Sequence, residues 1–234
     1  APVVTLLEPR EALTEFQRAG KIRYIGVSNE TAFGVMRYLQ LAEKHELPRI
    51  VTIQNPYSLL NRSYEVGLAE VTQYEGVELL AYSCLAFGTL SGKYLNGAKP
   101  AGARNTLFSR FTRYSGEQAQ KAIAAYVDIA KRHNLDPSQM ALAVVRRQPF
   151  VASTLLGATT MEQLKANVES LHLELSEEVL AEIEAVHQVY TYPAPYWNEG
   201  RAVNPASFVT AALPDPQHAT RQRIPPAKPD AHLP

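Results

Sequence analysis

Apolar residues in this chain follow two patterns: short continuous runs, and longer stretches in which they recur three or four positions apart. The short runs predict buried strands at about 22–27, 50–54, 77–82 and 151–156. The longer stretches predict helices over 11–19, 31–45, 62–75, 116–134, 160–171 and 176–189. A further helix is predicted to begin at Asp136-Pro137, because Asp caps a helix well and Pro fits its first turn.

The order of these elements, apolar strands separated by helices, predicts a parallel sheet with helical crossovers. An open doubly wound sheet and a closed (β/α)8 barrel both satisfy this order. No strand is followed by a Gly-x-Gly-x-x-Gly turn, which disfavours the doubly wound dinucleotide-binding arrangement. A loop over about 83–115, rich in Gly, Ser, Lys and Arg, interrupts the alternation, and a loop this long is more often functional than idle.

Residues 196–234 differ in character from the rest of the chain. They contain seven of the sixteen prolines and show no hydrophobic period. Such a segment buries too little apolar surface to offset the entropy lost on ordering. The sequence therefore predicts one folded domain over 1–195 and a disordered, proline-rich tail over 196–234.

The amino-acid composition argues against several classes of binding partner for this chain. The 23 basic residues balance 23 acidic ones, so we expect no nucleic-acid partner and no binding to an anionic membrane. No apolar run approaches the roughly 20 residues that span a bilayer. The single cysteine, Cys84, excludes an intramolecular disulfide and a thiolate zinc site, and we expect no metal and a reducing, cytoplasmic setting. The first residues show neither a signal peptide nor an initiator methionine, which indicates a fragment or a processed chain.

Five segments carry a resemblance to a known family. In chain order they are GKIRYIGVSN, IQNPYSLLNR, LLAYSCLAFGTLSGKY, NLDPSQMALAVVRRQP and LLGATTMEQLKANVESL. Their order and spacing, over roughly residues 1–195, resemble the aldo-keto reductase superfamily. The resemblance implies a (β/α)8 barrel that binds NADP(H) at the carboxyl ends of its strands and acts on a small carbonyl or alcohol substrate. The four strands predicted here would be the fifth to eighth, so the chain would be the C-terminal half of the barrel.

In the resemblance, three polar residues at strand ends hold the carboxamide of the nicotinamide: Ser28, Asn29 and Gln54. Their side chains offer both the donors and the acceptors that an amide needs. A structural alternative is that Ser28 and Asn29 only cap the following helix. Tyr82, at the end of the third strand, would stack on the nicotinamide ring, and its alternative role is that of a core residue at the rim of the barrel.

The family resemblance places the pyrophosphate against the segment Ser83–Lys93, where backbone N–H groups and a lysine charge would hold it. The expected contacts there are Ser83, Leu85, Gly88 and Lys93. Gly88 and Gly92 would allow a close approach of the backbone. From composition alone, an ordinary surface loop is the alternative. Arg104, farther along the loop, occupies a region where some relatives place a cofactor-contacting arginine.

The adenosine and phosphate end of the site would be formed by Gly157, Thr159, Gln163 and Asn167. Gly157 leads to the start of a helix, which attracts anions. Thr160 and Gln163 also form a capping box by themselves, so Gln163 has a purely structural alternative. Some relatives carry Arg at the position of Thr159 or an acid at the position of Ala166. Their absence here leaves the choice between NADP and NAD open.

The family's catalytic Asp, Tyr, Lys and His lie on the first four strands, which this chain does not contain, so we expect no catalytic residue within it. The resemblance implies that the protein is, by family, an NADP-dependent oxidoreductase. By itself the chain is expected to be inactive, either as the product of a truncated gene or as a non-catalytic nucleotide-binding protein. Half a barrel would also expose two strand edges and an apolar inner face, which predicts poor solubility, a molten state or association with a partner.

Overall fold

The computed structural model describes residues 8–194, and the side chains of 13–194. The chain divides into two units, Ala1–Glu199 and Gly200–Pro234, and every described residue belongs to the first. The disorder predicted for 196–234 therefore lies outside the described residues. No helix in the described part of the chain combines the length and the apolar character needed to cross a membrane.

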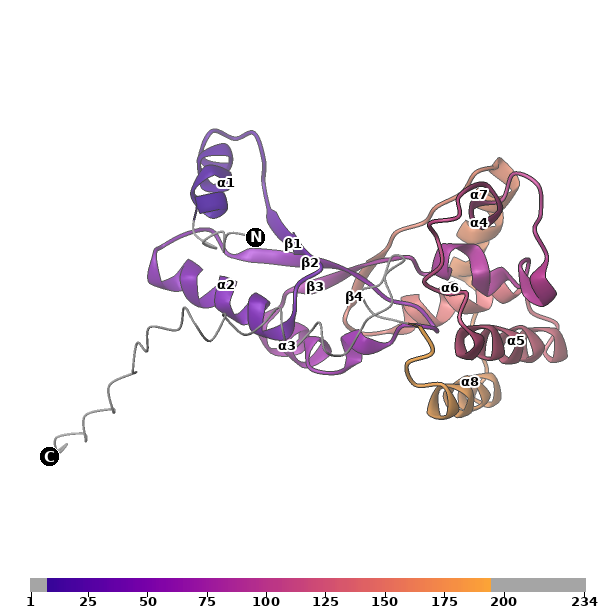
Figure 1. The fold of residues 1–234 in the computed structure, drawn as a ribbon. Coiled ribbons are helices and arrows are strands. Elements are labelled where there is room, and N and C mark those ends of the chain that lie inside the picture. The colour runs from indigo at the N-terminus through magenta and orange to yellow at the C-terminus, as the bar shows by residue number, and fades with distance from the viewer. Residues whose placement is uncertain (1–7, 195–234) are drawn as a thin grey trace, which may run out of the picture. The chain divides into compact units, whose positions relative to one another are not determined.

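Four parallel strands form one sheet in the order β1-β2-β3-β4 (Figure 1). Their bounds are β1 Ile25–Ser28, β2 Ile50–Pro56, β3 Glu78–Tyr82 and β4 Val151–Thr154. The α/β class, the four strands and their parallel pairing are thus confirmed. Within the described residues β1 and β4 each pair on one side only, so the sheet has two open edges.

Helices connect and flank the strands. The α-helices are α1 Glu8–Arg18, α2 Ala32–Lys44, α3 Leu68–Glu75, α4 Arg104–Leu107, α5 Glu117–Arg132, α6 Pro137–Arg147, α7 Met161–Glu169 and α8 Glu177–Val189. Short 3-10 helices are η1 Ser63–Glu65, η2 Ala86–Ser91, η3 Leu95–Gly97 and η4 Ser170–His172. The predicted start of α6 is confirmed, because Asp136 Oδ1 accepts hydrogen bonds from the N–H groups of Ser138 and Gln139 at 2.8 and 2.9 Å.

Two predictions of local structure were wrong in detail. The helix predicted over 62–75 is divided, because Gly67 adopts φ +91° between η1 and α3. The long loop predicted over 83–115 contains η2, η3 and the single-turn helix α4. These turns contain non-glycine residues with positive φ, Phe87 and Asn96 among them, which periodicity cannot signal.

One face of the sheet is covered by helices and forms an apolar core. Ile25, Ile53 and Leu79 on three neighbouring strands are at most 6% exposed. Val35 and Leu39 of α2 belong to the same cluster, together with residues of α3 and α6. The hydrophobic face of α2, predicted from helical spacing, is therefore the face that covers the strands. A second cluster, made mainly by α5, α6 and α8, continues this core beyond the strands.

The other face of the sheet is not covered within the described residues, and it is more polar than we predicted. The register places Ser28, Gln54, Leu80 and Ser153 in one row across all four strands. A second row contains Gly26, Thr52 and Glu78. Alternation along each strand sends these side chains away from the apolar core. The expectation of an apolar inner face is therefore wrong, because only Leu80 in these two rows is a large apolar residue.

Gly26 is required where β1 lies against β2. A methyl group there would overlap Thr52 Oγ1 and lie 3.0 Å from the Thr52 carbonyl oxygen. We expect Gly26→Ala to lower the free energy of unfolding by about 1–3 kcal/mol, the usual effect of overpacking. Gly116→Ala is the matched control: nothing lies within 4 Å of its added carbon, and it should cost no more than about 1 kcal/mol. Urea unfolding followed by circular dichroism measures both, and equal losses would contradict the expectation.

Candidate functional site

The ends of the first three strands bring four predicted site residues together. Ser28 Oγ donates to the Gln54 carbonyl oxygen at 3.0 Å, and Asn29 Nδ2 donates to Ser28 Oγ at 3.1 Å. Tyr82 donates its hydroxyl proton to Asn29 Oδ1 at 2.7 Å. Parallel strands bring their carboxyl ends to one edge of the sheet, so residues up to 53 positions apart meet here. We call Ser28, Asn29, Gln54 and Tyr82 the strand-end cluster.

The turn after β1 is set by Asn29 rather than by a helix cap. Asn29 has φ +57°, in the left-handed region that Asn tolerates better than most residues, and its N–H donates to the Gln54 carbonyl oxygen at 3.0 Å. The cap of α2 is Thr31, whose Oγ1 accepts from the Gly34 N–H at 3.1 Å. Ser28 and Asn29 are therefore not the cap of this helix, which removes the structural alternative considered for them.

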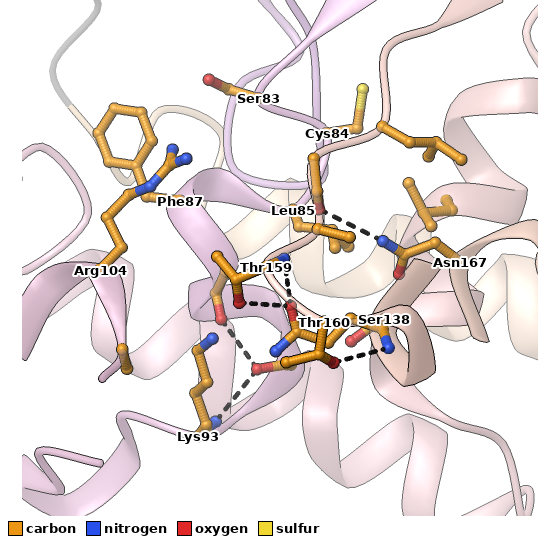
Figure 2. A pocket seen from close by; sticks show the side chains of 18 of the residues that line it. Ser83, Cys84, Leu85, Phe87, Lys93, Arg104, Ser138, Thr159, Thr160 and Asn167 are labelled. Carbon is orange, nitrogen blue, oxygen red and sulfur yellow. Dashed lines mark hydrogen bonds between the residues drawn. The ribbon is translucent and has the colours of Figure 1, made fainter. Parts of the chain in front are cut away.

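A cleft of about 780 Å³ begins at Tyr82 and is lined by the β3–α5 connection, the β4–α7 connection and the first turns of α6 and α7 (Figure 2). It is lined by ten of the thirteen predicted cofactor residues: Tyr82, Ser83, Leu85, Gly88, Lys93, Arg104, Gly157, Thr159, Gln163 and Asn167. The remaining three, Ser28, Asn29 and Gln54, do not line it, but they reach it through the hydrogen bond between Asn29 and Tyr82.

The charge of the cleft has one sign. Among the described residues that line it, Lys93 and Arg104 are the two charged ones, and none is a carboxylate. In Figure 2 both come from the same connection, with Ser138 and Thr160 across from them. Hydroxyl groups from Ser and Thr residues add donors without adding charge. The lining therefore suits an anionic ligand.

Backbone conformation in η2 brings the lysine to the cleft. Gly88 has φ +84°, and a methyl group on it would lie 3.2 Å from Lys93 Nζ. Gly92 has φ +79° and lies against Val127 of α5. Only glycine fits both requirements, a left-handed backbone and a close neighbour. Both glycines predicted to allow a close approach thus hold the β3–α5 connection in a shape that leaves the Lys93 ammonium above the backbone of Gly88.

Aromatic rings hold the arginine segment of the same connection. The guanidinium of Arg104 lies 5.4 Å from the centre of the Phe111 ring, and that of Arg113 lies 5.7 Å from the Phe87 ring. Phe87 contacts Phe111 edge-on, with 5.1 Å between ring centres. Such cation–π contacts help to hold a guanidinium in place.

The opposite wall is made by the loop before α7. Thr160 Oγ1 accepts from the Gln163 N–H at 3.2 Å, which confirms Thr160 as the cap. The Gln163 side chain, however, accepts from Thr159, from its N–H and its hydroxyl, both at 3.0 Å. The predicted capping box is therefore displaced by one residue. Asn167 Nδ2 donates to the Gly157 carbonyl oxygen at 3.4 Å, so this loop is fastened at both ends to α7.

Several residues of the cleft were not predicted from the sequence. They are Phe87, Ser91, Leu142, Leu155, Leu156, Ala158, Thr160, Ser138 and the segment 100–103. Ser138 could have been found, because the predicted helix start at Asp136 places it in the first turn of α6. Phe87, Ser91 and the segment 100–103 belong to the β3–α5 connection, whereas Leu142 belongs to α6 and the others to the β4–α7 connection, so their meeting depends on how these segments pack together.

A partly buried ion-pair network ties the segment after β2 to α8. Arg62 donates to both carboxylate oxygens of Glu65 at 2.7 and 2.8 Å and to Glu184 at 2.7 Å, while Tyr57 donates to Glu65 at 2.5 Å. His187 lies on α8, and burial, together with the nearby Arg62 charge, lowers its pKa. None of these side chains lines the cleft, so the network is structural support for it.

One group among the described residues offers ligand atoms close enough for a metal ion: His133, Glu178 and Glu182. Arg132 already donates to both carboxylate oxygens of Glu182 and, with His133, holds the pKa of that carboxyl at about 2. The group is accounted for as an ion-pair cluster, and none of its members lines the cleft.

Cys84 is expected to be unreactive in the folded chain. It is 2% exposed, its thiol donates to the Ala81 carbonyl oxygen at 3.3 Å, and burial raises its pKa to about 12. The thiolate is the reactive form, so the thiol remains protonated throughout the neutral range. Treatment with a chromogenic disulfide at pH 8 should give no signal until denaturant unfolds the chain. Rapid labelling of the native chain would contradict this.

Comparison with known proteins assigns the family. The aldo/keto reductase family model matches residues 1–188. The chain is 87% identical to Protein tas of Escherichia coli (strain K12) over 195 residues, which cover 83% of this chain and 56% of that protein. It is 32% identical to L-glyceraldehyde 3-phosphate reductase of Escherichia coli O157:H7 over 76% of this chain and 53% of that protein. It is 31% identical to NADH-specific methylglyoxal reductase of Escherichia coli (strain K12), over 74% and 51%.

The chain spans about half the length of the curated relatives it matches. The strands, the strand-end cluster and the cleft all lie within the matched region 1–188. The chain therefore belongs to the aldo/keto reductase family.

Proposed function

We propose that this chain binds NADP(H) and forms the cofactor side of a reductase that transfers hydride between the nicotinamide and a small carbonyl or alcohol. The observation that carries the proposal is the continuity of two features. The strand-end cluster meets, at Tyr82, a cleft whose charged lining residues are Lys93 and Arg104. A nicotinamide dinucleotide has matching groups: an uncharged amide at one end, which suits the strand-end cluster, and phosphates along the rest, which suit the two cations.

Each residue has a role in this proposal that its chemistry supports. Ser28, Asn29 and Gln54 would hold the carboxamide with hydroxyl and amide groups. The ring of Tyr82 would lie against the nicotinamide, with its orientation fixed by the hydrogen bond to Asn29. Lys93, with the backbone of the Ser83–Lys93 segment, would hold the pyrophosphate. The cofactor supplies the hydride, and these side chains hold the ring in a fixed place for its transfer.

The lining of the cleft also supports NADP(H) over NAD(H). A site for NAD commonly places a carboxylate on the 2′-hydroxyl of the adenosine ribose. The described lining contains no carboxylate and two cations, which suits a 2′-phosphate. One relative bears the name NADH-specific methylglyoxal reductase, so family membership by itself does not decide between the two cofactors. Titration with NADPH and NADH separately tests this part of the proposal.

We further propose that the four strands are the fifth to eighth of an eight-stranded barrel. Their all-parallel order, the two open edges and the uncovered polar face support this arrangement. A parallel sheet is normally covered on both faces, and closure into a barrel would remove both edges. The cleft at the carboxyl ends of these strands agrees with the position of active sites in such barrels.

For the 234-residue chain by itself we propose cofactor binding without turnover. The cofactor roles above account for the strand-end cluster and the charged residues of the cleft, and they assign no proton donor for a carbonyl oxygen. Fluorescence titration with NADPH measures binding, and the decrease in absorbance at 340 nm with a panel of small aldehydes and ketones measures turnover. Binding without turnover is expected. Carbonyl-dependent oxidation of NADPH would reject the inactive half of the proposal, and absence of binding would reject the cofactor half.

Lys93 should supply much of the affinity for the phosphates. We expect Lys93→Met to weaken NADPH binding by about tenfold at low salt, since a charge-assisted hydrogen bond contributes roughly 1.5–3 kcal/mol in a shielded site and less where it is exposed. Lys99→Met is the matched control, because Lys99 lies in the same connection but does not line the cleft. Isothermal titration calorimetry at two salt concentrations checks both variants. Equal effects at Lys93 and Lys99 would show that only overall charge matters.

A further inference from the structure

Asn55 is a polar residue buried on the helix-covered side of the sheet. It is 1% exposed, and alternation along β2 places it on the same face as Ile53. Its Nδ2 donates to the Glu30 carbonyl oxygen at 3.0 Å. Glu30 directly follows Asn29, so Asn55 holds the turn after β1 from the face opposite the strand-end cluster.

Two further contacts fix the same turn. The Glu30 carboxylate accepts from the Thr31 N–H at 3.3 Å and packs so closely on Gly34 that a methyl group there would overlap it. The Asn29 N–H donates to the Gln54 carbonyl oxygen at 3.0 Å. The turn is therefore held at successive residues, and Asn55 is the contact that comes from a buried side chain.

Stability alone does not account for an amide at this position. Asn55 Oδ1 is buried and has no hydrogen-bond partner among the described residues. A buried amide with an unpaired oxygen stabilises a fold less than an apolar side chain of the same size. An apolar residue could not donate the hydrogen bond that Asn55 Nδ2 makes. The acceptor of this bond is the carbonyl oxygen of Glu30, which lies next to Asn29 in the turn after β1.

We propose that Asn55 is a positioning residue for the nicotinamide end of the site. By holding the Glu30 carbonyl it keeps Asn29 in its left-handed conformation, and so keeps the Asn29 side chain on the Tyr82 hydroxyl. This inference rests on the proposed cofactor site and names a residue that does not itself touch the cofactor. Loss of Asn55 should therefore weaken contacts to the nicotinamide and leave those to the adenosine and phosphates intact.

The test compares two ligands on the 234-residue chain. NADPH reaches both ends of the site, whereas adenosine 2′,5′-bisphosphate reaches the adenosine and phosphate end only. For Asn55→Leu we expect NADPH to bind about three- to tenfold more weakly, the effect of losing about one hydrogen bond. The bisphosphate should bind within about twofold of wild type.

Thr72→Val is the matched control. It removes a buried hydrogen bond of the same kind, from Thr72 Oγ1 to the Val77 carbonyl oxygen at 2.9 Å, and also the bond of 2.6 Å between Thr72 Oγ1 and the Tyr64 hydroxyl. Both lie before the start of β3 and therefore away from the site. This variant should lower stability and leave the ratio of the two affinities unchanged. Asn55→Ser, whose hydroxyl is too short to reach Glu30, is a second variant in case the leucine disturbs folding.

Hydrogen exchange of the Asn29 amide gives a readout that does not depend on the cofactor. Exchange at Asn29 should be faster in both Asn55 variants and unchanged in Thr72→Val. The positioning role is overturned if the Asn55 variants lose affinity for NADPH and for the bisphosphate equally, or if they lose affinity for neither. If the wild-type chain binds neither ligand, the proposed function fails, and unchanged protection of the Asn29 amide would then overturn the local claim separately.

Discussion

Parallel pairing of β1, β2 and β3 is the constraint on which the site depends. It brings residues 28, 54 and 82, which lie on three different strands, to one edge of the sheet. Ser28 is directly opposite Gln54, and Pro56 is opposite Tyr82. A shift of one residue in either register would turn these polar groups toward the apolar core and expose its residues instead. The core of Ile25, Ile53 and Leu79 therefore fixes the geometry of the strand-end cluster as well as the stability of the sheet.

The uncovered face of the sheet is polar, which differs from the pattern of strands that are buried on both faces. Strands buried on both faces are continuous apolar runs, whereas β1 to β4 place Ser28, Thr52, Gln54 and Ser153 on the uncovered side. The short apolar runs in the sequence predict strands that are buried on both faces, and hence an apolar face here. Burial alternates instead along β3 and over residues 52–55 of β2, with the covered face more buried. Polar residues on an uncovered face remain hydrated in water, which weakens the prediction that half a barrel is poorly soluble.

The limits of prediction from sequence are seen in particular residues. Strands and helices followed from periodicity, and the start of α6 followed from Asp136 and Pro137, because these signals are local. Ten of the residues that line the cleft followed from the family motifs, which carry long-range information that periodicity lacks. Phe87, with φ +61°, and the short helices after β3 could not be predicted, since they depend on contacts with Phe111 and α5 that are distant in sequence. The role of Asn55 could not be predicted for the same reason, because its acceptor, Glu30, is 25 residues away in the sequence.

The two cations of the cleft and the uncharged strand-end cluster differ in how they can interact with a ligand. Lys93 and Arg104 face no carboxylate within the described lining of the cleft. Their attraction to phosphate is strong but poorly directional, particularly for the lysine ammonium. The strand-end cluster is uncharged, and its hydrogen bonds among Ser28, Asn29 and Tyr82 set the directions of donors and acceptors before a ligand binds. In the proposed cofactor site, affinity would therefore depend mainly on the cations, and the placement of the reacting ring would depend on the cluster, because a fixed array of donors and acceptors accepts only one orientation of an amide.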